Sequence, residues 1–175
     1  PQDVARLQAV AAVGQAGLIE AYDRTFRKHQ RIAAQVLLTA DDLDDRTRYF
    51  NVRNTLRALL DFQAIPIINE NDTVAVDELM ATFGDNDHLA ALVTNLLQAP
   101  LLVILSDVQG LFDGDPNEES SRLIHTVHTL DDSVLEYVRD RRGGFGKGGM
   151  ASKLNAARIA TTAGENVIIA SGREP

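Results

Sequence analysis

Apolar residues follow two patterns along the chain, one typical of helices and one typical of strands. Four long segments have a helical pattern: residues 3–28, 46–62, 88–97 and 150–163. Four short apolar runs bounded by polar or turn residues predict strands: residues 34–38, 65–69, 101–105 and 167–170. Because helices and strands alternate with short connections, the pattern predicts a parallel α/β sheet.

The same pattern predicts which side chains face the interior. In the first helix the apolar residues at helical spacing are Val4, Leu7, Val10, Ala11, Leu18, Tyr22 and Phe26. In the second helix the inward residues are expected to be Phe50, Val52, Leu56, Leu59 and Leu60. The run at residues 101–105 is apolar throughout, as expected for a strand buried on both faces.

The remaining segments are expected to be loops and short elements. Residues 39–45 contain four aspartates and predict a polar loop, and residues 143–149 predict a flexible glycine-rich loop. Residues 123–127 predict a short strand, and residues 131–138 a short helix that opens on two aspartates. Gly164 is expected to close the last helix.

A polar segment between residues 69 and 87 is the first candidate site. The apolar run before it stops at Ile68, and Asn, Asp and Glu are then frequent up to the start of the next helix. Open α/β sheets bind ligands at the carboxyl ends of their strands, so these residues predict a site. The alternative is that they only form turns and cap the helix at Asn86 or Asp87. One cap and one turn need only two or three such residues, which favours the site.

The glycine-rich loop before Met150 is the second candidate site. Backbone N–H groups of such a loop, together with a helix N-terminus, can bind an anion. Lys153 is one turn into the following helix, and helical side chains lean toward the N-terminus, so its ammonium can reach that anion. The loop is not a Walker A motif, and the alternative is a mobile surface loop.

Asp107, at the tip of the third strand, is expected at the same sheet edge, unless it only caps a turn. The four histidines show no metal-ligand spacing. His125 and His128 are three apart on a predicted strand and are therefore expected on opposite faces of it. The chain has no cysteine and no Gly-x-Ser-x-Gly elbow, so neither a thiolate nor a serine-elbow nucleophile is expected.

Composition restricts the classes of function further. With 175 residues and no repeat or long linker, residues 1–175 are predicted to form one domain. A net charge of -8 argues against nucleic-acid binding, and no apolar run approaches the length of a membrane span. No signal peptide is visible, and because the first residue is Pro1 rather than Met, upstream sequence is expected.

Six stretches, taken in order, resemble motifs of the amino acid kinase family. They are residues 8–15, 35–39, 65–72, 84–87, 106–111 and 148–154. The combination of Asn-Glu-Asn-Asp at 69–72 with Gly-Asp-Asn-Asp at 84–87 is similar to the members that phosphorylate glutamate. The resemblance implies a three-layer α/β/α sandwich around a mainly parallel central sheet. It also implies transfer of the γ-phosphoryl group of ATP, with Mg²⁺, to the γ-carboxylate of L-glutamate, the first step of proline synthesis.

The resemblance also implies roles for individual residues. By the match, the glutamate-binding residues are Asn69, Asp72 and Asn86, and the catalytic residues are Lys153 and Asp87, which organises the lysines. The implied nucleotide-binding residues are Ser106, Asp107, Gly148, Gly149, Met150 and Lys153, and no residue is implied as a metal ligand. Physical chemistry agrees, because an ionised carboxylate needs no general base and the reaction needs mainly alignment and neutralisation of phosphoryl charge.

The chain departs from the family pattern in several places. A first strand with a Lys-Gly-Ser phosphate loop is not present, so the domain is expected to be N-terminally incomplete and these 175 residues alone are expected to be inactive. No second domain, such as the C-terminal PUA domain of many members, is expected within them. Ser106 is found where threonine is usual, and Lys147 where threonine is common.

The resemblance further implies a cytoplasmic homo-oligomer with a glutamyl phosphate reductase as pathway partner, and no nucleic-acid or membrane partner. Two alternatives stay open. The first is another member of the family, such as an acetylglutamate, aspartate or uridylate kinase. The second is a non-catalytic binding module on the same fold.

Overall fold

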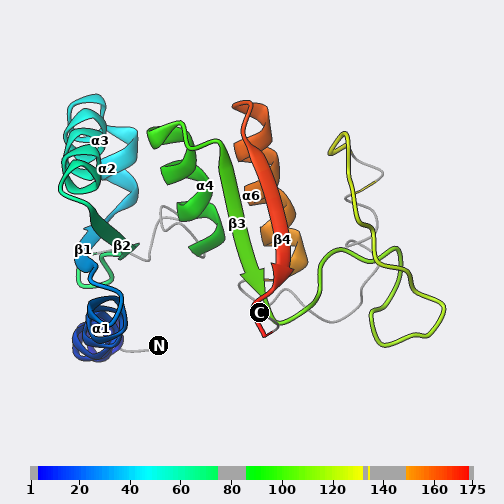
Figure 1. Ribbon diagram of the computed structural model, residues 1–175, viewed down its shortest axis with the longest axis horizontal. Helices are drawn as coiled ribbons and strands as arrows, with labels where there is room; N and C mark the ends of the chain where they lie inside the picture. Colours follow the sequence, from blue (N-terminus) through cyan, green and yellow to red (C-terminus); the bar gives the residue numbers. More distant parts are fainter. Residues whose placement is uncertain (1–3, 75–85, 132–133, 135–148, 174–175) are drawn as a thin grey trace. The chain divides into compact units, whose positions relative to one another are not determined.

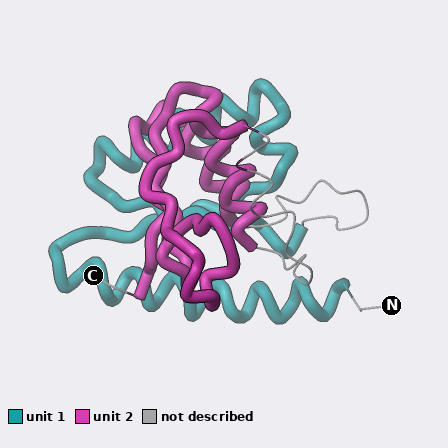
Figure 2. Tube along the Cα trace, turned by 90° about the vertical axis from the view of Figure 1, so that its right-hand side faces the viewer, with its two compact units in different colours: residues 1–84 teal, residues 85–175 magenta. Residues whose placement is uncertain are grey.

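The computed structural model describes residues 4–74, 86–131, 134 and 149–173. The chain divides into two compact units, residues 1–84 and residues 85–175, which are coloured separately in Figure 2. That residues 1–175 form one domain stays a prediction, and each unit is described below by itself. No helix in the described part of the chain is long and apolar enough to cross a bilayer.

The first unit pairs two parallel strands with helices. Its elements are α1 (Val4–Arg27), β1 (Ile32–Leu38), α2 (Ala40–Asp44), α3 (Arg46–Asp61) and β2 (Ala64–Glu70) (Figure 1). The register of β1 and β2 runs from Ile32 opposite Ala64 to Leu38 opposite Glu70. Helix α1 contacts β1, and α3 contacts β2. The two carboxyl ends therefore meet at one edge, as the sequence predicted.

The predicted loop at residues 39–45 is wrong, because it contains the short helix α2. The Asp42 carboxylate accepts hydrogen bonds from the Thr39 N–H and the Thr39 hydroxyl, each at 2.8 Å. Asp45 then caps α3 by accepting from the Arg48 N–H at 2.8 Å. Aspartates that looked like loop residues therefore stabilise two successive helix starts.

Fewer side chains are buried in the first unit than the sequence predicted. Leu56 is fully buried, but Phe50 and Leu60, which were also expected inside, are 43% and 50% exposed. Helix α1 has no buried residue, although part of its length contacts β1. The expected core side of these helices is therefore only partly covered within the described residues.

The second unit is built from α4 (Asn86–Leu97), β3 (Leu101–Ser106), α6 (Met150–Thr162) and β4 (Asn166–Ser171). Strands β3 and β4 are parallel, from Leu101 opposite Asn166 to Ser106 opposite Ser171, and α4 and α6 pack beside them and against each other (Figure 1). The core cluster consists of Ala91, Leu102, Ile104, Ala156 and Ala160. Three alanines in this cluster allow the helices to approach the sheet closely.

Strand β3 is buried on one face, so the prediction of burial on both faces is wrong for it. Leu102 and Ile104 are buried, whereas the alternating residues Leu101, Val103 and Leu105 are 45–66% exposed. The alternation follows from the pleat, because successive side chains point to opposite faces and α4 and α6 cover only one. A continuous apolar run does not by itself show that both faces are covered.

The end of α6 matches the expectation. Ala163 is the C-cap and Gly164 follows with a φ of +98°, a left-handed conformation that suits glycine. The Gly164 N–H donates to the Thr161 carbonyl at 3.0 Å, and the Glu165 N–H to the Ala160 carbonyl at 3.1 Å. These bonds satisfy carbonyls of the last turn.

The segment after β3 is mostly loop. The strand predicted at residues 123–127 is wrong, because only a single antiparallel bridge joins Leu123 to Phe112. Most of the predicted 131–138 helix and of the 143–149 loop lies outside the described residues.

Candidate functional site

The topology of the second unit places two helix N-termini at the carboxyl edge of its sheet. Helix α4 leads through a short turn into β3, and α6 leads similarly into β4. The C-terminus of each helix therefore adjoins the start of its strand, and the N-terminus lies toward the strand's carboxyl end. Ligands of open α/β sheets bind at this edge, where helix N-termini attract anions.

Asp87 and Lys153 meet at this edge. The Lys153 Nζ donates to the Asp87 Oδ2 at 2.9 Å, and their side chains are only 11% and 15% exposed. Asp87 is in the first turn of α4 and Lys153 in the first turn of α6. The two residues are 66 positions apart in sequence, so the packing of α4 on α6 creates the pair.

The start of α6 leaves N–H groups without a side-chain cap. Gly149 is the N-cap in an extended conformation and makes no side-chain capping hydrogen bond. A glycine cap has no oxygen to offer the first-turn N–H groups, so an external acceptor can take that place. Met150 is the first helical residue, and Gly148 lies outside the described residues.

Ser106 and Asp107 follow at the tip of β3. The Ser106 carbonyl accepts from the Gly172 N–H at 2.7 Å, which ties the ends of the two strands together. The Ser106 hydroxyl donates to Asp107 Oδ1 at 3.3 Å and accepts from the Val108 N–H at 3.5 Å. The serine thus orders the turn, while the Asp107 side chain is exposed.

The polar segment after β2 lines a cavity of about 240 Å³ in the first unit. Its walls come from α1, β1 and the end of β2: Ala11, Ala12, Gln15, Ala16, Gln35, Leu37, Glu70, Asn71, Asp72 and Thr73. Asn69 is adjacent and donates through Nδ2 to Gln15 Oε1 at 3.0 Å. A hollow with polar lining residues therefore lies at this strand tip, and the prediction that it binds a ligand stays a prediction.

The candidate residues fall into two groups, one in each unit. Asn69 and Asp72 belong to the first unit, and Asn86, Asp87, Ser106, Asp107, Gly149, Met150 and Lys153 to the second. Asn86 and Asp87 are the first two helical residues of α4, so neither flanks the helix as a cap would. Among the described residues, no group of three or more His, Cys, Asp or Glu side chains could hold a metal ion.

Sequence reasoning missed Gln15, whose contact with Asn69 joins residues 54 positions apart. Helical spacing could indicate that Gln15 lies on α1, but no local pattern pairs a helix glutamine with a distant strand end. The motif at residues 8–15 contained it, although no role was assigned to it.

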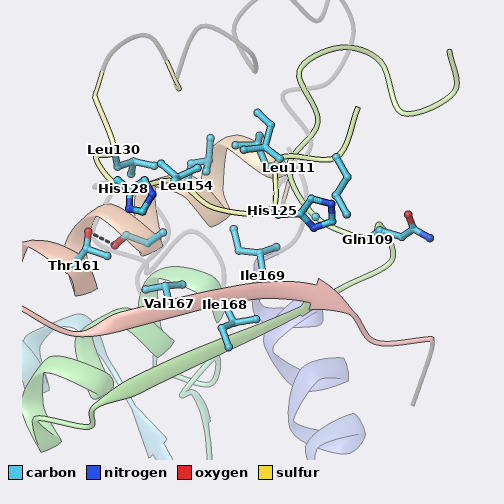
Figure 3. Close-up of a pocket in the computed structure, with 15 residues that line it drawn as sticks. Gln109, Leu111, His125, His128, Leu130, Leu154, Thr161, Val167, Ile168 and Ile169 are labelled. Carbon is cyan, nitrogen blue, oxygen red and sulfur yellow. Dashed lines mark hydrogen bonds between the residues drawn. The ribbon is translucent and has the colours of Figure 1, made fainter. Parts of the chain in front are cut away.

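A second hollow, of about 340 Å³, was also missed (Figure 3). It lies between the loop after β3 and the α6 and β4 elements, and Ile169 points toward the loop that carries His125 and His128. Both histidines line this hollow, so the expectation that they lie on opposite faces of a strand is wrong. Its described lining is mainly aliphatic and contains no carboxylate, lysine or arginine, so it lacks the groups that phosphoryl chemistry needs.

Comparison with known proteins gives the family. The model of the amino acid kinase family matches residues 2–171. A glutamate 5-kinase from Pseudomonas fluorescens is 53% identical over 175 residues, covering 99% of this chain and 46% of the relative. One from Rhodopirellula baltica is 49% identical over 174 residues, covering 99% of this chain and 45% of the relative. The chain thus spans slightly less than half the length of these relatives.

A solved structure supports the fold. A carbamate kinase from Giardia lamblia bound to AMP-PNP superposes with a TM-score of 0.63 at 20% identity, covering 94% of this chain and 66% of that chain. At this identity the similarity concerns the fold alone, and it confirms the predicted α/β class. The match of the family model over nearly the whole length decides the family, and the chain belongs to the amino acid kinase family.

Proposed function

We propose that the protein containing this chain transfers the γ-phosphoryl group of ATP to the γ-carboxylate of L-glutamate. The observation that carries the proposal is the partly buried Lys153–Asp87 pair at the carboxyl edge of the β3–β4 sheet. Support for the substrate comes from relatives about half identical to this chain that are glutamate 5-kinases.

In this proposal Lys153 neutralises charge on the transferring phosphoryl group. A carboxylate oxygen of glutamate forms a bond to the γ-phosphorus, the bond to the bridging oxygen breaks, and ADP leaves with that electron pair. The acceptor is already ionised, so no proton has to be removed, and charge repulsion is the main obstacle. Asp87 holds the ammonium in place at 2.9 Å, which lowers the cost of reorganisation during the reaction.

The residues of the polar strand tip are proposed to bind glutamate. The Asp72 carboxylate and the Asn69 amide are acceptors suited to an α-ammonium group, and Asp72 lines the cavity beside β2. Asn86, at the first position of α4, is proposed to bind the same substrate. These assignments rest on the motif match and on the cavity's polar lining.

The nucleotide is proposed to bind along the other strand tip. Ser106 and Asp107 end β3, and Gly148, Gly149 and Met150 precede or begin α6, whose N-terminal N–H groups suit a phosphate. Mg²⁺ is proposed to accompany ATP. Mg²⁺ keeps several waters and is often held by substrate phosphates with one or two carboxylates.

The remaining proposals concern the whole protein. We propose a cytoplasmic homo-oligomer whose product, an acyl phosphate, passes to a glutamyl phosphate reductase. An acyl phosphate hydrolyses readily, so a consuming reaction that accepts it directly is chemically expected. Neither a nucleic acid nor a membrane is proposed as a partner, in keeping with the net charge of -8.

The function is tested on the full-length protein with ATP, Mg²⁺ and L-glutamate. ADP release is followed, and the acyl phosphate is trapped with hydroxylamine as a hydroxamate. L-aspartate, N-acetyl-L-glutamate and UMP are tested as alternative acceptors. They distinguish a glutamate kinase from an aspartate, acetylglutamate or uridylate kinase. Hydroxamate formed only with L-glutamate supports the proposal, whereas turnover with another acceptor and none with glutamate contradicts it.

A further inference from the structure

Gln15 lines the strand-tip cavity and takes no part in the proposed function. It lies in the middle of α1, is partly buried and lines the cavity together with Asp72 and Glu70. Its Oε1 accepts the hydrogen bond from Asn69 Nδ2 at 3.0 Å. Its Nε2 is shielded from water and has no hydrogen-bond partner among the described residues.

An amide donor left without a partner inside a protein costs free energy, because it has lost its bonds to water. An apolar side chain of similar length would avoid this cost at the same position. The amide is anchored at one end by Asn69, and the terminal torsion of glutamine is soft. Because Gln15 lines the cavity, its amide lies beside the space that a ligand would occupy.

The other polar groups of the cavity indicate what such a ligand carries. Two carboxylates, from Glu70 and Asp72, line the cavity and favour a cationic group. Gln15 adds a donor, which favours an anionic or carbonyl oxygen. A free α-amino acid offers both, an ammonium and a carboxylate one carbon apart. The small side chains of Ala11, Ala12 and Ala16 leave room for it along α1.

The cavity volume suits a ligand of this size. Pockets for drug-sized molecules typically enclose roughly 300–1,000 Å³. The cavity of about 240 Å³ is smaller, as a single amino acid requires.

We propose that Gln15 is a substrate-binding and specificity residue, whose Oε1 fixes the Asn69 amide and whose Nε2 donates to the α-carboxylate of bound L-glutamate. The inference rests on the proposed function, because it takes L-glutamate as the ligand. It implies that the site selects a free α-carboxylate, so the α-amide of glutamate binds more weakly.

The test measures equilibrium binding by calorimetry on the full-length protein, without ATP. The ligands are L-glutamate and its α-amide, and the variants are Gln15→Met and Gln15→Glu. Gln8→Met is the control, since Gln8 lies on the same helix but does not line the cavity. Gln15→Met removes the donor at similar volume, and Gln15→Glu replaces it with an acceptor. Melting temperatures verify that each variant is folded.

Gln15→Met is expected to weaken L-glutamate binding about 10- to 100-fold, as loss of a hydrogen bond to a charged group does. The α-amide should bind more weakly by a smaller factor, because the change also removes the Oε1 that fixes Asn69, and the preference of the parent protein for glutamate should disappear. Gln15→Glu should weaken glutamate binding further, because two carboxylates then face each other. Gln8→Met should bind like the parent.

The possible failures can be told apart. If the parent protein binds no glutamate, both the proposed function and this inference are overturned. If the parent binds glutamate but Gln15→Met binds it equally well, only the inference is overturned. Equal weakening for glutamate and its α-amide would show a structural role and would also contradict the donor assignment. Should Gln15→Met fail to fold, Gln15→Glu and the parent's own preference between the two ligands decide the matter.

Discussion

Lys153 lies where a helix disfavours a cation. The first turn of a helix carries the positive end of the macrodipole, which costs a positive side chain roughly 0.3–1 kcal/mol. Its partner Asp87 is also largely shielded from water, and buried ion pairs contribute little net stability. A placement that is poor for stability is expected where charge is needed for chemistry, because the same N-terminus and the same ammonium both attract a phosphoryl group.

Replacing Lys153 by alanine in the full-length protein is expected to lower kcat at least roughly a hundredfold, as removal of one transition-state contact does. ATP binding should be largely retained, since the lysine is assigned to the transferring group. Steady-state kinetics and equilibrium nucleotide binding measure the two effects. Arg158→Ala, an exposed cation on the same helix, is the matched control and should leave kcat unchanged. Near-normal turnover by Lys153→Ala would refute its role.

The assignment of Asp72 makes a prediction for substrate affinity. Asp72→Asn keeps the shape of the side chain but removes the charge that is proposed to bind the substrate ammonium. The KM for glutamate should rise far more than the KM for ATP, and both are measured on the full-length protein. Asp61→Asn, an exposed change at the end of α3, controls for lost surface charge. An unaltered glutamate KM would exclude Asp72 from the substrate site.

At the scale of elements, sequence patterns predicted the long helices and the four strands to within a few residues. Regular spacing over many residues is a strong signal. The family resemblance predicted roles for Asp87 and Lys153, and the structure places these two side chains in contact. Local turn chemistry was harder, because aspartates that cap α2 and α3 read equally well as a loop. The face that a strand buries, and the contact of Gln15 with Asn69, depend on distant partners that no local pattern shows.

The start of α2 should make stability depend on pH through Asp42. Burial by itself raises the pKa of this carboxyl group, but hydrogen bonds from the Thr39 N–H and hydroxyl and the Arg48 guanidinium outweigh it and leave the pKa below its ordinary value. A carboxyl group whose pKa is lowered by folding stabilises the folded state above its unfolded pKa, about 3.9. That contribution is lost as the pH falls through the lower, folded value.

Asp42→Asn should therefore reduce the free energy of unfolding by about 0.5–2 kcal/mol at pH 7, the usual cost of losing a capping interaction. The difference in the free energy of unfolding between this variant and the parent protein should shrink below pH 4 and vanish in stronger acid. Denaturant unfolding at a series of pH values measures this. Asp44→Asn, an exposed aspartate on the same helix, should show no comparable pH-dependent loss. A difference that stays constant down to low pH would contradict the assignment.

At the scale of the whole molecule, fold and chemistry are preserved to different extents among relatives. The carbamate kinase shares the fold at 20% identity, whereas the glutamate 5-kinases are 49–53% identical over nearly all of this chain. A shared fold does not fix the substrate, so the proposal of glutamate is supported by the relatives of about half identity and by the side chains at the strand tips. The pair proposed to act on the phosphoryl group and the cavity proposed to bind the amino acid lie beside different strand pairs, so a substitution in one need not disturb the other.

Each unit by itself has a small sheet. Within the described residues each sheet contains two strands, and two-stranded sheets are marginal unless other elements cover them. Parallel sheets normally have both faces covered, yet the face of β3 opposite its core side carries Leu101, Val103 and Leu105, all exposed. The expectation that residues 1–175 form one domain stays a prediction, and it implies that the two units unfold together.

Cooperativity is tested by placing a cavity in one unit and measuring the other. Leu56 is fully buried in the first unit, and Leu56→Ala should cost about 2–5 kcal/mol, as for other buried leucines. The slowest amides exchange through global unfolding, so in a cooperative domain Leu56→Ala should reduce hydrogen-exchange protection equally in β2 and in β3 of the second unit. Leu60→Ala, at a half-exposed leucine on the same helix, is the control and should reduce the protection of both strands far less. Loss of protection confined to the first unit would show that the two units unfold independently, and residues 1–175 would then not be one domain.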